Sequence, residues 1–142
     1  MIISEMKPMV YGGDSEVLYY EIFDDGYGIL IENIHGSHPC GYIKMPKELK
    51  DKIIVDVGDE EVENMLWVDA PVHGGFTFFG KRHPQDFYEW FIGWDYAHLG
   101  DYLGYEGSIH HPDNEKKWTT EEILEEAKVI LKALREGKYG IY

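Results

Sequence analysis

The segment from Thr119 to Gly137 places the strongest constraint on the fold, because its apolar residues recur with the period of an α-helix. Thr119 and Glu122 form a capping box at its start, and Gly137 follows basic residues at its end. The apolar positions, spaced one, three or four residues apart, are Ile123, Leu124, Ala127, Ile130, Leu131 and Leu134. A helix with one such apolar stripe must bury it against another element.

The runs that precede this helix have the composition of β-strands. Residues 17–23 and 28–34 are rich in β-branched and aromatic side chains, and the Asp-Gly sequence between them favours a hairpin. Further strands are expected at residues 40–45, 67–80 and 87–94. We therefore predict an α+β fold, a mostly antiparallel sheet with one C-terminal amphipathic helix packed on a face, in a single domain spanning residues 1–142.

Three further expectations concern the connecting segments. Gly74 and Gly75 would interrupt the strand of residues 67–80 with a bulge. Residues 46–53 are expected to form a short helix with proline at its first position, and residues 57–64 an acidic loop. Residues 95–117 are expected to be irregular, and loops of such length in compact domains often carry function.

The charge of the chain restricts its partners. The formal net charge of −14, from 27 acidic and 13 basic residues, argues against DNA or RNA as a partner, because phosphate backbones would be repelled. Cys40 is the single cysteine, so no disulfide framework can form within the chain. The first residues lack the pattern of a signal peptide, and no apolar run is long enough to span a bilayer. We expect a cytoplasmic protein with no membrane association.

Polar side chains at the ends of the expected strands are the candidates for function, since familiar catalytic and nucleotide-binding motifs are absent. The candidate catalytic residues are His73, Asp95, His98 and Asp101. If their strands are neighbours, His98 backed by a carboxylate would act as a general base. In a second version, His73, Asp95 and His98 would hold a divalent metal such as Zn²⁺, Mn²⁺ or Fe²⁺. The candidate ligand-binding residues are His38, Tyr42, Gly74, Gly75, Thr77 and Trp94.

Several of these residues also have a structural explanation. Asp95 and Asp101 would cap turns, and His73 would be a core histidine bonded to a backbone carbonyl. Cys40 would be either a nucleophile or a buried thiol, and free cysteines are usually buried.

Three segments in a fixed order, CGYIKMP, VHGGFTF and GWDYAHLGD, followed by the amphipathic helix, resemble a family of small uncharacterised proteins of bacteria and especially bacteriophages. The resemblance covers residues 38–136. It implies that one set of positions belongs together: Cys40, Gly41, Tyr42, His73, Gly74, Gly75, Thr77, Asp95, Ala97, His98, Gly100 and Asp101. Tyr96 departs from the family, in which cysteine is common at this position, so a cysteine is not essential there. The resemblance implies a genomic context and a set of residues, and no reaction.

The phage context suggests an anti-defence role in the cytoplasm of the host cell. We expect a phosphodiesterase-like hydrolase of a cyclic nucleotide or ADP-ribose-type immune signal, in which His73 protonates the leaving group. The Gly74 and Gly75 N–H groups would bind a phosphate oxygen, and Tyr42 and Trp94 would stack a base. One alternative is a non-catalytic nucleotide-binding sponge, with a pocket deepened by homo-oligomer formation. The other is an acidic inhibitor that binds a host protein.

Overall fold

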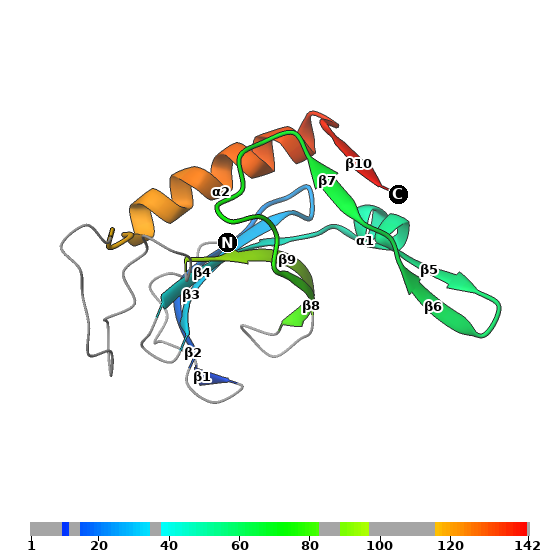
Figure 1. The fold of residues 1–142 in the computed structure, drawn as a ribbon, viewed down its shortest axis with the longest axis horizontal. Helices are drawn as coiled ribbons and strands as arrows, with labels where there is room; N and C mark the ends of the chain where they lie inside the picture. The colour runs from blue at the N-terminus through cyan, green and yellow to red at the C-terminus, as the bar shows by residue number, and fades with distance from the viewer. Residues whose placement is uncertain (1–9, 12–14, 35–37, 83–88, 97–115, 142) are drawn as a thin grey trace.

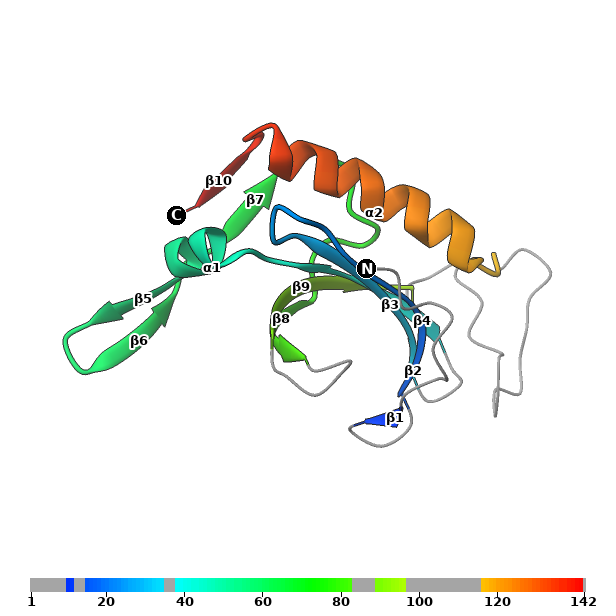
Figure 2. The ribbon, with the colours of Figure 1, turned by 180° about the vertical axis from the view of Figure 1, so that it is seen from behind.

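The computed structural model describes residues 10–11, 15–34, 38–82, 89–96 and 116–141 of the chain. Its largest element is a six-stranded sheet in the order β1–β2–β3–β4–β9–β8, in which all neighbouring strands are antiparallel (Figure 1). The strands are β1 (Val10–Tyr11), β2 (Ser15–Ile22), β3 (Gly28–Ile34), β4 (His38–Lys44), β8 (Phe78–Arg82) and β9 (Glu89–Asp95). The sheet curves away from α2 (Thr120–Arg135), which lies along its convex side (Figure 2). The predicted α+β fold, with a C-terminal helix on one face of the sheet, is confirmed.

Helix α2 begins and ends where the sequence signals indicate. The N–H of Glu122 donates to Thr119 Oγ1 at 3.2 Å, and the N–H of Thr119 donates to Glu122 Oε1 at 3.1 Å, which completes the capping box. At the other end Gly137 has φ +73°, and the N–H groups of Gly137 and Lys138 donate to the carbonyls of Leu134 and Ala133. This is the Schellman pattern, which satisfies the last carbonyls of a helix.

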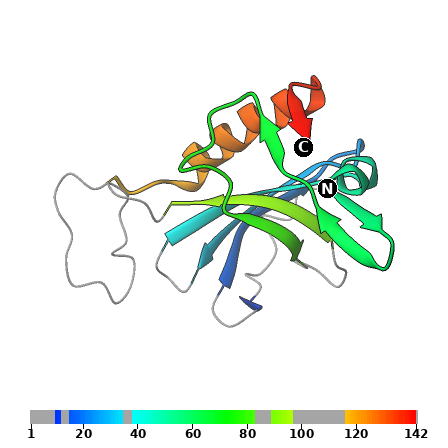
Figure 3. The same ribbon diagram turned by 45° about the vertical axis from the view of Figure 1, so that its right-hand side comes forward.

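The two faces of the sheet carry separate apolar clusters, as the alternation of side chains along a strand requires. The convex face lies under α2 and includes Ile29, Ile31, Ile43, Ile92 and Trp94 (Figure 3). The concave face carries Tyr20, Leu30, Cys40, Tyr42 and Phe91. Cys40 is therefore a buried residue of the concave face.

Buried tyrosines predict how the fold responds to alkali. Burial, aided by the hydrogen bond to Glu21, raises the pKa of Tyr19 to about 12, and burial raises the pKa of Tyr27 to about 12. Burial likewise raises the pKa of Tyr20 above its ordinary value of 10.0. Above pH about 10 the unfolded chain loses phenolic protons that the folded chain keeps, so stability is unaffected below pH 10 and falls as the pH rises through 12. Absorbance of phenolate at 295 nm, followed together with circular dichroism, should show these tyrosines ionising only as the protein unfolds. Their ionisation in a fully folded chain near pH 10 would contradict the expectation.

The strand expected over residues 67–80 is in fact two strands in different sheets, so the prediction of one bulged strand was wrong. β7 (Leu66–Val68) pairs with β10 (Tyr139–Ile141), whereas β8 forms an edge of the six-stranded sheet. The residues between them include Pro71, which cannot donate a ladder hydrogen bond, and the Gly74–Gly75 turn.

Helix α1 (Lys47–Ile53) confirms the short helix expected here, except that Pro46 is its N-cap and not its first residue. Leu49 and Ile53 are the buried residues that attach it to the core. Neither α1 nor α2, the helices in the described part of the chain, combines the length and apolar composition needed to cross a bilayer.

The expected acidic loop over residues 57–64 was also a wrong prediction. β5 (Ile54–Val57) and β6 (Glu60–Glu63) form an antiparallel hairpin. Its turn contains Gly58 with φ +65°, a conformation that favours glycine. The hairpin projects from the body of the protein (Figures 1 and 2).

Candidate functional site

The structure brings together the three segments that carry the candidate residues. Strands β4 and β9 are neighbours, with register partners Cys40 and Asp95, Gly41 and Trp94, and Tyr42 and Gly93. The N–H of Thr77 donates to the carbonyl of Gly93 at 2.9 Å, and this bond holds the residues before β8 against the last residues of β9. Residues 40–42, residue 77 and residues 93–95, which are separated in the sequence, therefore meet at the end of β9.

Glycine and aromatic residues alternate across this strand pair, and each ring lies over the opposite glycine. A Cβ atom on Gly41 would lie 2.5 Å from Cζ2 of Trp94, and a Cβ atom on Gly93 would fall within 3.0 Å of the Tyr42 ring. Trp94 is 1% exposed and belongs to the cluster under α2, whereas Tyr42 is 4% exposed and belongs to the concave cluster. The two rings are thus buried on opposite faces, and the expectation that they jointly stack a base is corrected.

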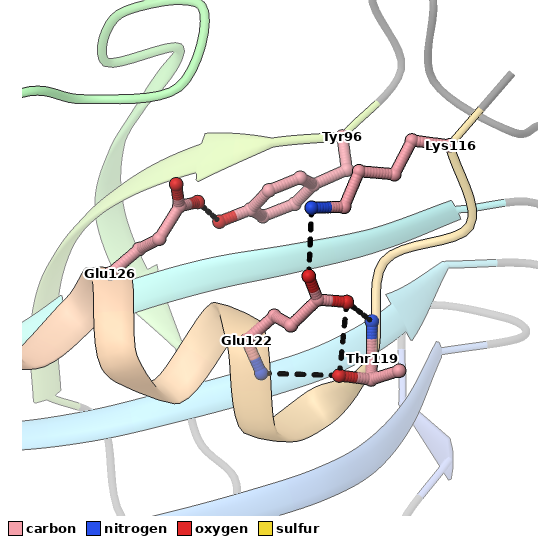
Figure 4. Close-up of polar contacts among 5 residues, drawn as sticks. All are labelled: Tyr96, Lys116, Thr119, Glu122 and Glu126. Carbon is pink, nitrogen blue, oxygen red and sulfur yellow. Dashed lines mark hydrogen bonds and ion pairs between the residues drawn. The ribbon is translucent and has the colours of Figure 1, made fainter. Parts of the chain in front are cut away.

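A hydrogen-bonded chain connects β9 to α2. Trp94 Nε1 donates to the hydroxyl of Tyr96 at 2.9 Å. That hydroxyl donates to the Glu126 carboxylate, as Figure 4 shows. Tyr96 is fully buried and Glu126 half-buried, so the indole N–H and the phenol hydroxyl have protein partners in place of water. The sequence reading did not single out Glu126, because its contact with Tyr96 joins positions thirty residues apart.

A second polar network fixes the start of α2 next to the hydrogen bonds of Tyr96. Lys116 Nζ lies 2.7 Å from Glu122 Oε2, and this contact, with the hydrogen bonds from Thr119, lowers the pKa of the Glu122 carboxyl (Figure 4). The same ammonium lies 3.9 Å from the ring centroid of Trp118, a cation–π distance. The Lys116 ammonium is therefore already paired with a carboxylate and a ring.

His73 is held in place by a tight turn and two rings. The N–H of Gly75 donates to the carbonyl of Val72 at 2.9 Å, which closes a β-turn, and Gly74 at its third position has φ +69°, a conformation that favours glycine. The half-buried imidazole stacks on Tyr96 at 4.5 Å between centroids and 19° between planes. It also meets Trp118 edge-on at 4.9 Å.

This turn changes the role expected of the glycines. The Gly75 N–H is used by Val72, so Gly75 does not supply the phosphate donor expected of it. Gly74 is needed for its positive φ, and both glycines are exposed at the surface. Their conformation explains the His-Gly-Gly sequence without a ligand.

Asp95, the last residue of β9, lies on the other side of this strand from His73. The hydroxyl of Thr77 donates to Asp95 Oδ2 at 3.0 Å, which orients the carboxylate. Alternation along β9 directs Asp95 to the concave side with its register partner Cys40, whereas Tyr96 faces α2. His73 and Asp95 therefore lie on opposite sides of the strand end, and a ligand that touches both must lie across it.

Of the three remaining candidates, His38, His98 and Asp101, the structure describes His38. His38 is half-buried at the start of β4, two residues before Cys40 and hence on the concave side. His98 and Asp101 lie outside the described residues. Within the described part of the chain no three His, Cys, Asp or Glu side chains are grouped to hold a metal ion.

One carboxylate missed by the sequence reading belongs to this region. Glu32 is fully buried on β3 and is the register partner of Cys40, so Glu32, Cys40 and Asp95 form a row across three neighbouring strands. Burying a carboxylate is costly, and buried ionisable groups cluster at functional sites. The signal in the sequence was a glutamate within the apolar run of residues 28–34.

Comparison of the whole chain with protein-family models, curated proteins and solved structures returns no match. Membership of the family suggested by the three segments therefore stays a proposal.

Proposed function

We propose that the protein hydrolyses a small nucleotide-derived molecule that binds across the end of β9. The observation that carries the proposal is the meeting of three sequence segments at this point. It supplies an imidazole, His73, on one side and a hydroxyl-oriented carboxylate, Asp95, on the other. A base and an acid on two sides of a bound ester are the groups that hydrolysis requires.

The proposed roles follow from this geometry. Asp95, oriented by Thr77, takes a proton from the attacking water, and His73 donates a proton to the leaving oxygen. The stack on Tyr96 and the edge contact with Trp118 restrict the orientation of the imidazole, which saves entropy when the substrate binds. A metal-dependent version would use His73, Asp95 and His98 as ligands, which suits a divalent transition metal.

Charge favours chemistry over simple sequestration. A protein that only binds an anion would be expected to use arginine and lysine, whereas Lys116 beside Trp118 is already paired with Glu122. The resemblance to phage proteins suggests that the substrate is an immune signal of the host, either a cyclic nucleotide or an ADP-ribose-type molecule. One observation favours a sponge as the second candidate function: the half-buried Trp118 ring stands next to His73, where it could stack a base.

The proposal is tested by incubating the protein with cyclic dinucleotides, cyclic ADP-ribose isomers and linear nucleotides, then analysing the small molecules after denaturation. We expect products at many turnovers, and a loss of about 10²–10⁴ in rate for Asp95→Asn and for His73→Phe. Phenylalanine keeps the ring on Tyr96, so a lower rate at unchanged stability would report loss of proton transfer. Asp24→Asn, which makes the same chemical change on an exposed turn residue, is the control.

The other outcomes are distinct. Intact nucleotide released in one-to-one amount would overturn the hydrolase and support the sponge. Turnover that survives both substitutions would place the chemistry elsewhere. Metal analysis of the purified protein, with activity measured after chelation, separates the two versions of the hydrolase.

A further inference from the structure

The β5–β6 hairpin, residues 54–63, is an extension whose base adjoins α1. Its two strands pair with each other and with no other described strand. The ribbons show it standing away from the sheet and α2 (Figures 1 and 2). A two-stranded hairpin alone is marginally stable in water, so such an extension normally gains stability from something that packs on it.

The register gives the hairpin two different faces. Val55 lies opposite Val62, and Val57 lies opposite Glu60, so the three valines share one side with Glu60; this side is here called the valine face. Asp56 lies opposite Glu61, and Ile54 lies opposite Glu63, so the other side is the carboxylate face. On the valine face Val57 is 61% exposed and Val62 37% exposed, whereas Val55 is half-buried.

The described part of the chain covers each face only near the base, where Ile54 and Val55 are half-buried, and leaves Asp56, Val57, Glu61 and Val62 exposed. The valine face loses the free energy that burial would provide, at roughly 25 cal/mol per Å² of apolar surface. On the carboxylate face, Asp56 and Glu61 are like charges directly opposite each other, an arrangement that destabilises a strand pair. A partner that covers the valines and brings positive charge to the carboxylates would relieve both costs.

A pocket at the foot of the hairpin offers an anchor point. Its volume is about 300 Å³, and it lies between the chain leaving the hairpin and the β8–β9 edge of the sheet. The lining residues include Met65, Leu66, Phe76, Phe79 and Ile92. Met65 is 66% exposed at its rim. Pockets of this kind receive the large apolar side chains that dominate binding energy at protein interfaces.

We propose that the hairpin and this pocket form a docking surface for a basic protein partner. The partner lays an apolar strip on the valine face, places lysine or arginine side chains near Asp56 and Glu61, and inserts an apolar side chain into the pocket. Nucleic acid is repelled by the carboxylates. A second copy of the chain is disfavoured because each copy carries a formal net charge of −14. The free strand edges add main-chain hydrogen bonds if the partner contributes a strand.

The test uses a short, terminally blocked peptide of alternating lysine and valine as the probe. We expect it to slow hydrogen exchange across residues 54–63, and to bind about tenfold more weakly to an Asp56→Lys, Glu61→Lys variant. Asp24→Lys with Glu125→Lys gives the same change of charge on exposed residues elsewhere and should leave binding within about twofold. Val57→Thr with Val62→Thr keeps a high strand propensity and should also weaken binding.

Three outcomes would overturn the proposal. The first is no protection of residues 54–63 by the lysine–valine peptide. The second is equal protection by a lysine–serine peptide, together with unchanged binding when the valines are substituted. That result would show that the peptide is attracted only by the negative charge of the protein. The third is a dimer of the chain alone in sedimentation that disappears in Val57→Thr, which would assign the valine face to a second copy.

Discussion

Gly93→Ala is expected to destabilise the protein by about 3 kcal/mol, because its methyl group would occupy the space of the Tyr42 ring. A Cβ atom on Gly93 falls within 3.0 Å of Cδ1 and Cε1 of that ring and lies 3.1 Å from the carbonyl oxygen of Gly41. The ring cannot easily move aside, since Phe78 and Phe91 contact it edge-on at 5.3 and 6.3 Å between centroids. Crowding of this kind is relieved only by shifting the backbone of β4 or β9.

Denaturation by guanidinium or heat measures the effect, and we expect the melting temperature to fall by about 10 °C. Gly140→Ala is the matched control, because a Cβ atom there meets only Trp67 at an ordinary 3.7 Å, and its cost should stay within about 0.5 kcal/mol. The steric cause is checked in a Tyr42→Ala background, where Gly93→Ala should cost much less. An equal cost in both backgrounds would refute the ring as the reason for glycine at this position.

Tyr96→Phe is the second substitution with a large expected effect, about 2–3 kcal/mol of lost stability. It removes the hydroxyl that accepts from Trp94 Nε1 and donates to Glu126, and so leaves a buried indole donor and a half-buried carboxylate without this partner. The ring itself keeps its shape, so the stack with His73 is retained and the loss reports the hydrogen bonds.

Tyr20→Phe is a close control for this prediction. Tyr20 and Tyr96 are both 0% exposed, but the Tyr20 hydroxyl has no hydrogen-bond partner among the described residues. Its removal should therefore be neutral or slightly stabilising, because no hydrogen bond to a described residue is lost and a buried polar group is eliminated. Similar losses for the two variants in equilibrium unfolding would show that the hydroxyl of Tyr96 contributes nothing through Trp94 and Glu126.

The elements that could be predicted from the sequence are those fixed by local signals. Thr119 with Glu122, and Gly137 after the basic last turn, determine the ends of α2 within a few residues of themselves. The β5–β6 hairpin escaped prediction because Glu60, Glu61 and Glu63 have low strand propensity, although Val55, Val57 and Val62 show the alternation. The largely apolar segment that includes β7 and β8 concealed a change of sheet, which depends on pairing with β10 far along the chain.

In the candidate site, too, the features that depend on pairing between distant segments could not be predicted. The sequence singled out Tyr42 and Trp94 as walls of a pocket, but their role depends on the register that sets each ring over a glycine of the opposite strand. His73 and Asp95 do come to one strand end, and the side on which each lies follows from pairings that no local pattern encodes. Glu32 and Glu126 join the region only through contacts between distant segments.

The position of α2 and β10 at the end of the described chain has a consequence for synthesis on the ribosome. The strands of the six-stranded sheet all precede residue 96, whereas the helix that covers their convex face is made after them. Until residues 120–141 have emerged, Ile29, Ile31, Ile43 and Ile92 have no cover from α2, and β7 has no β10 to pair with. The nascent chain thus exposes an apolar surface from the synthesis of β9 until α2 has emerged, and completion of the helix is the step that ends this exposure.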